Sequence, residues 1–238
     1  SKHLVSDLSL YEKSYRKTFQ QFYGEINDYC ILALLPSYQE REDSSLIYMV
    51  DDLIKKSGHP KSGFYLNNLA ELFETIKELE GKGQKVILFG VTYALLDLAA
   101  QYPQPLKHTI IMETGGMKGK RKELLKEEIH QLLQEAFLTQ NIHSEYGMTE
   151  LLSQGYSKGK NIFNSPPWME ILIRDVNDPL SIIGNNKTGG INVIDLANIY
   201  SCPFIATQDL GKQFDDDSFS VLGRFDNSKV RGCNLLVQ

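Results

Sequence analysis

Continuous apolar runs alternate with amphipathic stretches over most of this sequence. Cys30–Leu35, Val86–Phe89 and Ile110–Met112 carry no charged side chain, which is typical of strands buried on both faces of a parallel sheet. Around them, apolar residues recur at helical spacing, as in Leu8–Phe22 and Leu69–Leu79. This alternation favours an α/β fold in which helices cover a parallel-rich sheet.

The expected elements divide the chain into two parts. We expect helices over residues 4–26, 45–56, 69–81, 91–102 and 120–137, and strands over 30–35, 63–66, 85–90, 108–113 and 142–146. After about Trp168 the pattern changes to short strands separated by turn residues, at 169–174, 190–195, 204–206 and 219–223. We therefore predict an α/β subdomain over residues 1–168 and a smaller β-rich lobe over residues 169–238.

Composition and charge narrow the classes of function. The 238 residues have a net charge of -5 and no basic block, which argues against nucleic acid as a main partner. The apolar runs are too short to cross a bilayer, and Ser1-Lys2-His3 is not the start of a signal peptide. The three cysteines show no pairing pattern and the histidines lack metal-ligand spacing. We expect a cytoplasmic protein.

Two stretches that follow predicted strands have compositions that packing does not require. Glu113-Thr114-Gly115-Gly116 has paired glycines, which let a backbone approach a ligand closely, although a plain turn has the same composition. Ser144–Glu150 offers a ring, a hydroxyl and a carboxylate where α/β sheets bind ligands. It is equally compatible with a polar strand–helix junction.

Two further stretches lie in the predicted β-rich lobe. Thr207–Gly211 places Asp209 beside a glycine, where the carboxylate could take both hydroxyls of a ribose or could simply belong to a hairpin turn. Gly223–Gly232 is dense in charge and bounded by glycines. Such a segment is often a solvated surface loop.

The order of these four stretches resembles the motif order of the adenylate-forming superfamily, which includes acyl- and aryl-CoA ligases. Tyr146–Glu150 is the most specific piece, and the resemblance spans almost the whole chain. Within the superfamily, Ser201–Asp209 and Arg231–Leu235 look most like the acyl-protein synthetases that handle fatty acyl groups in bacterial bioluminescence. Phenylacetate-CoA ligases are the next most similar. The resemblance implies a partial adenylate-forming large domain.

The resemblance also implies roles by matching position. Gly115 and Gly116 would line the adenine pocket, and Tyr146, followed by Gly147, would pack on the adenine. Asp209 would bind the ribose, and Thr149 would contact a phosphate. Glu150 would coordinate Mg²⁺, and Arg224 would reach the ribose or a phosphate. The implied cofactors are ATP and Mg²⁺.

The sequence departs from the superfamily pattern at both ends. The Ser/Thr/Gly-rich phosphate loop, which ends in a lysine, is missing, and Lys2 looks like that terminal lysine. We therefore expect an N-terminally truncated protein that is inactive by itself. The small C-terminal domain of the CoA ligases, with its catalytic lysine, is missing as well.

The implied activity is ATP-dependent activation of a carboxylic acid, with transfer of the acyl group to a protein thiol. The implied partners are the acid or acyl substrate, an acyl-transferring or reductase protein, and a second copy of the chain. An aryl- or acyl-CoA ligase is the alternative within enzymes. A non-catalytic fragment that binds a nucleotide or a partner is the alternative of another class.

Cys233 is a candidate acyl acceptor. Acyl-protein synthetases carry the acyl group on a cysteine near the C-terminus, and Arg231-Gly232-Cys233 resembles that neighbourhood. Arg231 and Lys229 would favour the thiolate, which is the nucleophile. The alternative is a small buried cysteine in a closing strand, because Leu235–Val237 follows at once.

Overall fold

The computed structural model describes residues 3–36, 44–116 and 124–225. Its α-helices are α1 (Leu8–Tyr23), α2 (Ser45–Ser57), α3 (Leu69–Gly81), α4 (Thr92–Gln101) and α5 (Lys126–Phe137). Its strands are β1 (Cys30–Leu34), β2 (Gly63–Phe64), β3 (Val86–Gly90), β4 (Thr109–Glu113), β5 (His143–Tyr146), β6 (Gly155–Ser157), β7 (Ile162–Asn164), β8 (Met169–Arg174), β9 (Ile182–Ile183), β10 (Thr188–Asp195), β11 (Phe204–Gln213) and β12 (Phe219–Arg224). Two short 3-10 helices, Ile26–Asp28 and Leu196–Asn198, complete the described elements.

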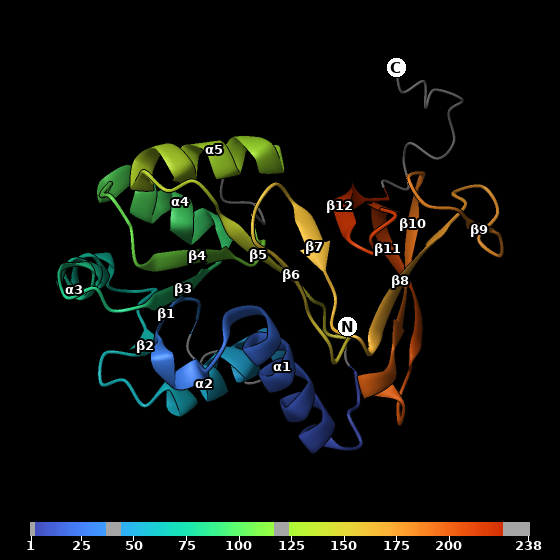
Figure 1. Ribbon diagram of the computed structural model, residues 1–238, viewed down its shortest axis with the longest axis horizontal. Helices are drawn as coiled ribbons and strands as arrows, with labels where there is room; N and C mark the ends of the chain where they lie inside the picture. Colours follow the sequence, from blue (N-terminus) through green and yellow to red (C-terminus); the bar gives the residue numbers. More distant parts are fainter. Residues whose placement is uncertain (1–2, 37–43, 117–123, 226–238) are drawn as a thin grey trace.

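All described strands join one sheet, in the order β2-β1-β3-β4-β5-β6-β7-β12-β11-β10-β8-β9 (Figure 1). The strands from β2 to β5 run parallel, and every pairing from β5 onward is antiparallel. The α/β fold is therefore confirmed, with the parallel strands in one half of the sheet and the β-rich part continuing it as the antiparallel half. The predicted boundary at 168/169 falls between β7 and β8, and as a domain boundary it stays a prediction.

Helices cover both faces of the parallel half. Alternate residues of β1 face opposite sides, so that Leu32 packs with α3, α4 and α5 while Ile31 packs with α1 and α2. Figure 1 shows these two helix layers above and below the parallel strands. A third core lies in the antiparallel half, where Phe163, Ile191 and Phe219 pack together.

Local sequence signals explain where the helices begin. The side chain of Asn68 accepts a hydrogen bond from the Glu71 amide at the start of α3, and Asp7 and Ser44 cap α1 and α2 in the same way. Helix α2 ends at Gly58, which adopts a left-handed conformation with φ of 63°. These caps fix the positions at which the helices begin and end.

Several predicted boundaries are wrong. Helix α1 is shorter than residues 4–26, and α5 begins at Lys126, although residues 120–123 lie outside the described part. Thr207–Gly211 is not a turn: it lies inside β11, where a bulge separates Leu210 from Gly211. A Cβ at Gly211 would lie 2.5 Å from the Ser220 carbonyl oxygen, so the glycine serves close strand approach.

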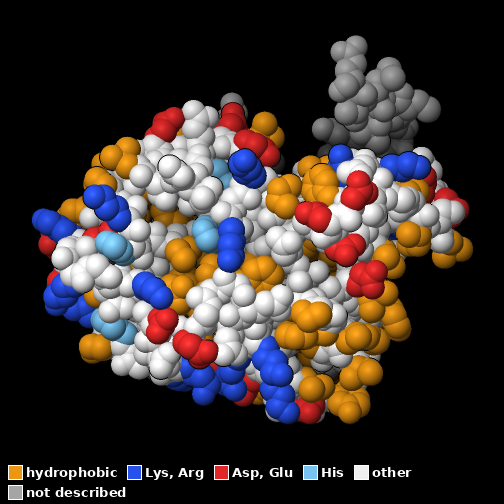
Figure 2. All heavy atoms as spheres, in the orientation of Figure 1, with side chains coloured by type: hydrophobic (Ala, Val, Ile, Leu, Met, Phe, Trp, Pro, Cys, Tyr) orange, Lys and Arg blue, Asp and Glu red, His pale blue; other side chains and the backbone are white. Residues whose placement is uncertain are grey.

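Exposed apolar side chains gather at one end of the antiparallel half. Figure 2 shows them at the lower right, over the ends of β10 and β11 and the start of the chain. Ile199, Tyr200 and Phe204 are 57%, 70% and 69% exposed, and the Ser201 hydroxyl donates to the Leu4 carbonyl, which brings the first residues alongside. None of the described helices is both long enough and apolar enough to span a membrane.

Candidate functional site

The first two predicted stretches lie at the carboxyl ends of neighbouring parallel strands, whereas Asp209 and Arg224 lie in the antiparallel strands β11 and β12. Strands β4 and β5 pair through Met112 with His143 and through Glu113 with Ser144. The Gly115–Gly116 turn follows β4, and Tyr146 closes β5. Because parallel strands end at the same edge, the first two predicted stretches lie at one edge of the sheet.

The Gly115–Gly116 turn has a conformation that favours glycine. The φ angles of the two residues are 79° and 95°, in the region that side chains rarely adopt. The Gly115 carbonyl accepts from the Thr92 amide at 2.9 Å, which ties the turn to the start of α4. A Cβ at Gly116 would lie 3.4 Å from the Val91 side chain. At this turn beside the end of β4, the backbone is therefore not shielded by side chains of its own.

Tyr146 and Asp209 are in direct contact, although 63 residues separate them. The Tyr146 hydroxyl donates to Asp209 Oδ2 at 2.9 Å, and each residue is 8% exposed. Burial, and then the Asp209 charge, raise the pKa of Tyr146, so the phenol stays protonated. The ring packs edge-on against Phe163 and Phe219, with centroids 6.1 and 5.6 Å away. The orientation of this ring is therefore fixed.

Arg224 approaches the same carboxylate from the neighbouring strand. Asp209 and Arg224 are paired in the β11–β12 ladder, and Arg224 Nε lies 3.6 Å from Asp209 Oδ1. The Arg224 side chain is 71% exposed, so water screens this pair and the guanidinium can turn toward a ligand. Asp209 thus has one oxygen facing Tyr146 and the other facing a mobile cation.

Thr149 and Glu150 lie in the segment directly after Tyr146, and both are half-buried. Gly147 lies between them and the strand, and a Cβ there would clash with Oε1 of the Glu145 carboxylate. The structure joins Tyr146, Asp209 and Arg224 by direct contacts, whereas Thr149 and Glu150 are connected to them through the chain. Lys2 and Cys233 lie outside the described residues.

Asp195 and Asn198 hold that segment in place, and the sequence analysis missed both. Asp195 is fully buried and accepts from the amides of Leu152 and Ser153 at 2.7 and 3.0 Å. The Asn198 side chain donates to the Glu150 carbonyl at 2.8 Å. An aspartate that ends a strand pattern gives no signal of a partner more than 40 residues away.

Magnesium is compatible with this donor set. Within the described part of the chain, no group of three or more acidic, histidine or cysteine side chains could hold a metal ion. Mg²⁺ commonly uses only one or two carboxylates and completes its shell with water and substrate phosphates. Glu150 supplies one such carboxylate, and the Thr149 hydroxyl is a second oxygen donor beside it.

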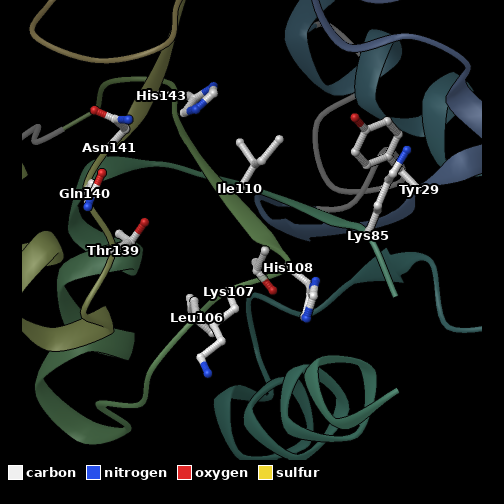
Figure 3. A pocket seen from close by; sticks show the side chains of 11 residues that line it. Tyr29, Lys85, Leu106, Lys107, His108, Ile110, Thr139, Gln140, Asn141 and His143 are labelled. Atoms are coloured by element: carbon white, nitrogen blue, oxygen red, sulfur yellow. The ribbon is translucent and has the colours of Figure 1, made fainter. Parts of the chain in front are cut away.

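A separate pocket opens at the opposite edge of the parallel sheet, where the strands begin (Figure 3). It has a volume of about 360 Å³, and its lining includes Lys85, His108 and His143. Burial, and then the Lys158 charge, lower the pKa of His143 to about 4, and Lys85 is paired with Asp28 at 3.2 Å. The predicted site residues within the described chain do not line this pocket, so it is distinct from the candidate site.

Comparisons with known proteins support the fold. No protein-family model and no curated protein sequence matches the chain. ATP-bound MatB from Rhodopseudomonas palustris is similar in structure, with a TM-score of 0.65 and 14% identity over 90% of this chain and 44% of MatB. The luciferase-like enzyme from the mealworm Zophobas morio has a TM-score of 0.57 and 18% identity over 88% of this chain and 53% of that chain.

A third similar structure is the amide bond synthetase McbA from Marinactinospora thermotolerans. Its TM-score is 0.61 at 13% identity, over 90% of this chain and 44% of McbA. The chain thus spans about half the length of the solved structures that it matches. Together with the sheet order, these likenesses show that the chain has the α/β fold found in part of each of these three enzymes.

Proposed function

We propose that this chain carries the nucleotide site of an enzyme that uses ATP to activate a carboxylic acid as an acyl-adenylate. The observation that carries the proposal is the contact of Asp209 with both Tyr146 and Arg224, beside the strand end that bears the Gly115–Gly116 turn. ATP-bound MatB, which shares the fold, supports the choice of nucleotide. The activity, substrates and partners of the whole protein are part of the proposal.

The adenosine part of ATP fits these side chains. A carboxylate only accepts hydrogen bonds, so Asp209 can hold the two ribose hydroxyls. The Tyr146 ring, fixed by Phe163 and Phe219, offers an apolar surface for a purine. The Gly115–Gly116 turn has no side chain to keep an aromatic base away from its backbone.

The phosphates would face Thr149, Glu150 and the exposed Arg224. Glu150 would hold Mg²⁺, which neutralises phosphate charge when bound. The Thr149 hydroxyl donates to a phosphate oxygen, and the Arg224 guanidinium stabilises charge that builds up in the transition state. These residues act by positioning and by electrostatic stabilisation, which dominate the catalysis of phosphoryl and adenylyl transfer.

In the reaction, a substrate carboxylate oxygen attacks the α-phosphorus of ATP. The bond from that phosphorus to the bridging oxygen breaks, and pyrophosphate leaves with its electron pair. A thiolate then attacks the acyl carbon, which yields a thioester and AMP. We propose a fatty acyl group and a protein thiol as acceptor, on the likeness of Ser201–Asp209 and Arg231–Leu235 to acyl-protein synthetases, with Cys233 as the candidate thiol.

The test of the nucleotide site is ATP binding by the 238-residue chain, measured by isothermal titration calorimetry. Asp209→Asn removes one acceptor oxygen and the charge, and we expect at least a tenfold weaker affinity. Asp217→Asn is the matched control, because Asp217 is an exposed loop carboxylate and should leave the affinity unchanged. An unchanged affinity in Asp209→Asn, or no ATP binding by the wild type, would contradict the proposal.

The acceptor needs its own experiment. A labelled fatty acid and ATP should label the active, loop-containing protein by a hydroxylamine-sensitive bond, and Cys233→Ser should abolish the label whereas Cys202→Ser should not. Label that survives in Cys233→Ser would exclude that cysteine. Formation of acyl-CoA without labelled protein would favour a CoA ligase, and ATP binding without either product would favour a non-catalytic fragment.

A further inference from the structure

A buried carboxylate lies directly behind the Gly115–Gly116 turn. Glu113, the last residue of β4, is 3% exposed. Its Oε1 accepts from the Gly115 amide at 2.8 Å and from the Thr92 hydroxyl at 2.5 Å. Thr92 begins α4, and its own amide donates to the Gly115 carbonyl. Glu113 therefore holds both sides of the junction between the turn and α4.

The second oxygen of Glu113 faces the neighbouring strand and α5. Ser144 Oγ lies 3.4 Å from Glu113 Oε2, and Lys126 Nζ lies 3.5 Å from the same oxygen. His130 Nε2 is 3.9 Å from Oε2 and 3.4 Å from Ser144 Oγ. Ser144 stands two residues before Tyr146 on β5. One carboxylate thus connects the Gly115–Gly116 turn with the strand that carries the tyrosine.

Lys126 extends this connection toward the ring of Tyr146. Its ammonium lies 5.0 Å from the centroid of the Phe163 ring, which packs edge-on against Tyr146. Two parts of the chain are predicted to contact adenine, the Gly115–Gly116 turn and the Tyr146 ring. Glu113 therefore touches the turn directly and is connected to the ring through Lys126 and Phe163.

The network keeps Glu113 ionised. Burial alone would raise the pKa of Glu113. The His130 imidazole, the Lys126 charge and the hydrogen bonds from Thr92 and Gly115 outweigh it and lower the pKa to about 2. An ionised carboxylate has two acceptor oxygens and no donor, which matches the donors that surround it.

We propose that Glu113 is a positioning residue that holds the Gly115–Gly116 turn and the Tyr146 strand in the arrangement that binds the adenine of ATP. This inference rests on the proposed function. The side chain itself is covered by the turn and by α5 and does not reach the ligand. A glutamine at this position would point an NH₂ group at groups that themselves donate hydrogen bonds. The turn would then lose the acceptor that fixes its conformation.

The chain contains a matched control at the other end of β4. Glu80 accepts from the amides of Lys107 and His108 at 2.9 and 3.0 Å and from the Thr109 hydroxyl at 2.6 Å. Glu80 is therefore also a carboxylate that accepts hydrogen bonds from β4 and the residues before it, but at the edge of the sheet opposite to the candidate site. Glu80→Gln breaks equivalent contacts without touching the turn.

The experiment measures ATP affinity by calorimetry and the midpoint of thermal unfolding for wild type, Glu113→Gln and Glu80→Gln. We expect Glu113→Gln to weaken ATP binding at least tenfold, and Glu80→Gln to stay within twofold of wild type. Amide hydrogen exchange should speed up over the peptide that contains Gly115 only in Glu113→Gln. ATP affinity within twofold of wild type in Glu113→Gln would overturn the proposal, as would equal losses of affinity in both variants.

Thr92→Val is the second variant, for the case in which Glu113→Gln does not fold. It removes one donor to the carboxylate, keeps the charge, and should weaken ATP binding by a smaller factor of about three. Unchanged affinity there would also count against the proposal. If the wild type binds no ATP, the proposed function fails and the positioning role fails with it. ATP binding by wild type with an unaffected Glu113→Gln overturns the positioning role alone.

Discussion

At the scale of single residues, two neighbouring glutamates of the candidate site have different pKa values because their surroundings differ. Glu113 and Glu145 lie near the ends of adjacent strands, yet the pKa of Glu113 is lowered to about 2 and that of Glu145 is raised to about 8. Burial is the main reason for Glu145, followed by repulsion from Glu113, and Lys126 only partly offsets them. Lys126 of α5 therefore favours the ionised form of both carboxylates, but it outweighs burial only at Glu113, where hydrogen bonds assist it.

The raised pKa of Glu145 predicts a pH-dependent stability. The ordinary pKa of glutamate is 4.5 and the folded value is about 8, so between these values the folded state binds more protons than the unfolded state. The free energy of unfolding should then fall as the pH rises through this window. Glu145→Gln should be more stable than wild type by more than about 1 kcal/mol at pH 8.5, with a negligible gain at pH 4.

Urea unfolding followed by circular dichroism at both pH values checks this prediction. Glu170→Gln, on the exposed side of β8, is the control that should show no such difference. If Glu145→Gln were equally stable relative to wild type at both pH values, Glu145 would be ionised at neutral pH like an ordinary carboxylate.

At the scale of elements, the sequence predicted most strands and helices but few of the contacts between them. The apolar run Cys30–Leu35 and the helical spacing over residues 69–81 are local patterns, and the structure has β1 and α3 at these places. Strands β6 and β7 are three residues each and lack alternation, so they were missed. Thr207–Gly211 was misassigned because a glycine at a bulge looks the same in sequence as a glycine in a turn.

The candidate site shows the same limit. Its residue types came from the motif order, whereas the Tyr146–Asp209 contact and the roles of Glu113 and Asp195 depend on which strands become neighbours. Asp195 binds amides 42 and 43 residues away along the chain. No local pattern encodes such a contact, because it arises only when β10 and the segment after β5 are packed together.

Asp195 should contribute strongly to stability. Asp195→Asn keeps the shape of the side chain but puts an amide donor among the buried donors of Leu152 and Ser153. We expect the free energy of unfolding to fall by about 2 to 3 kcal/mol. Asp178→Asn, in an exposed turn, should change it by less than about 0.5 kcal/mol. Chemical denaturation of both variants is the measurement, and equal small losses would contradict a structural role for Asp195.

At the scale of the whole molecule, the chain holds the adenosine side of the proposed site without a phosphate loop. No Ser/Thr/Gly-rich stretch ending in a lysine occurs among the residues that precede β1. Such loops supply several amide donors and a lysine to the phosphates, and loss of one oriented donor costs about 3 kcal/mol of transition-state stabilisation. We therefore predict that the 238-residue chain binds ATP but does not form an acyl-adenylate.

Carboxylate-dependent exchange of labelled pyrophosphate into ATP is the assay for this prediction. The reference is a longer protein in which a phosphate loop precedes Ser1. Exchange by the 238-residue chain at a rate near that reference would show that the described residues suffice for the chemistry.

The unbroken sheet has a mechanical consequence for this molecule. Paired strands connect β4 through β5, β6 and β7 to β12 and β11. The strand that ends at Tyr146 and the strand that holds Asp209 therefore cannot move apart as two rigid bodies about a hinge. Opening such a hinge would break several ladder bonds at about 1 kcal/mol each. Among the described residues, the exposed side chain of Arg224 can rotate and give the proposed nucleotide access without such a hinge.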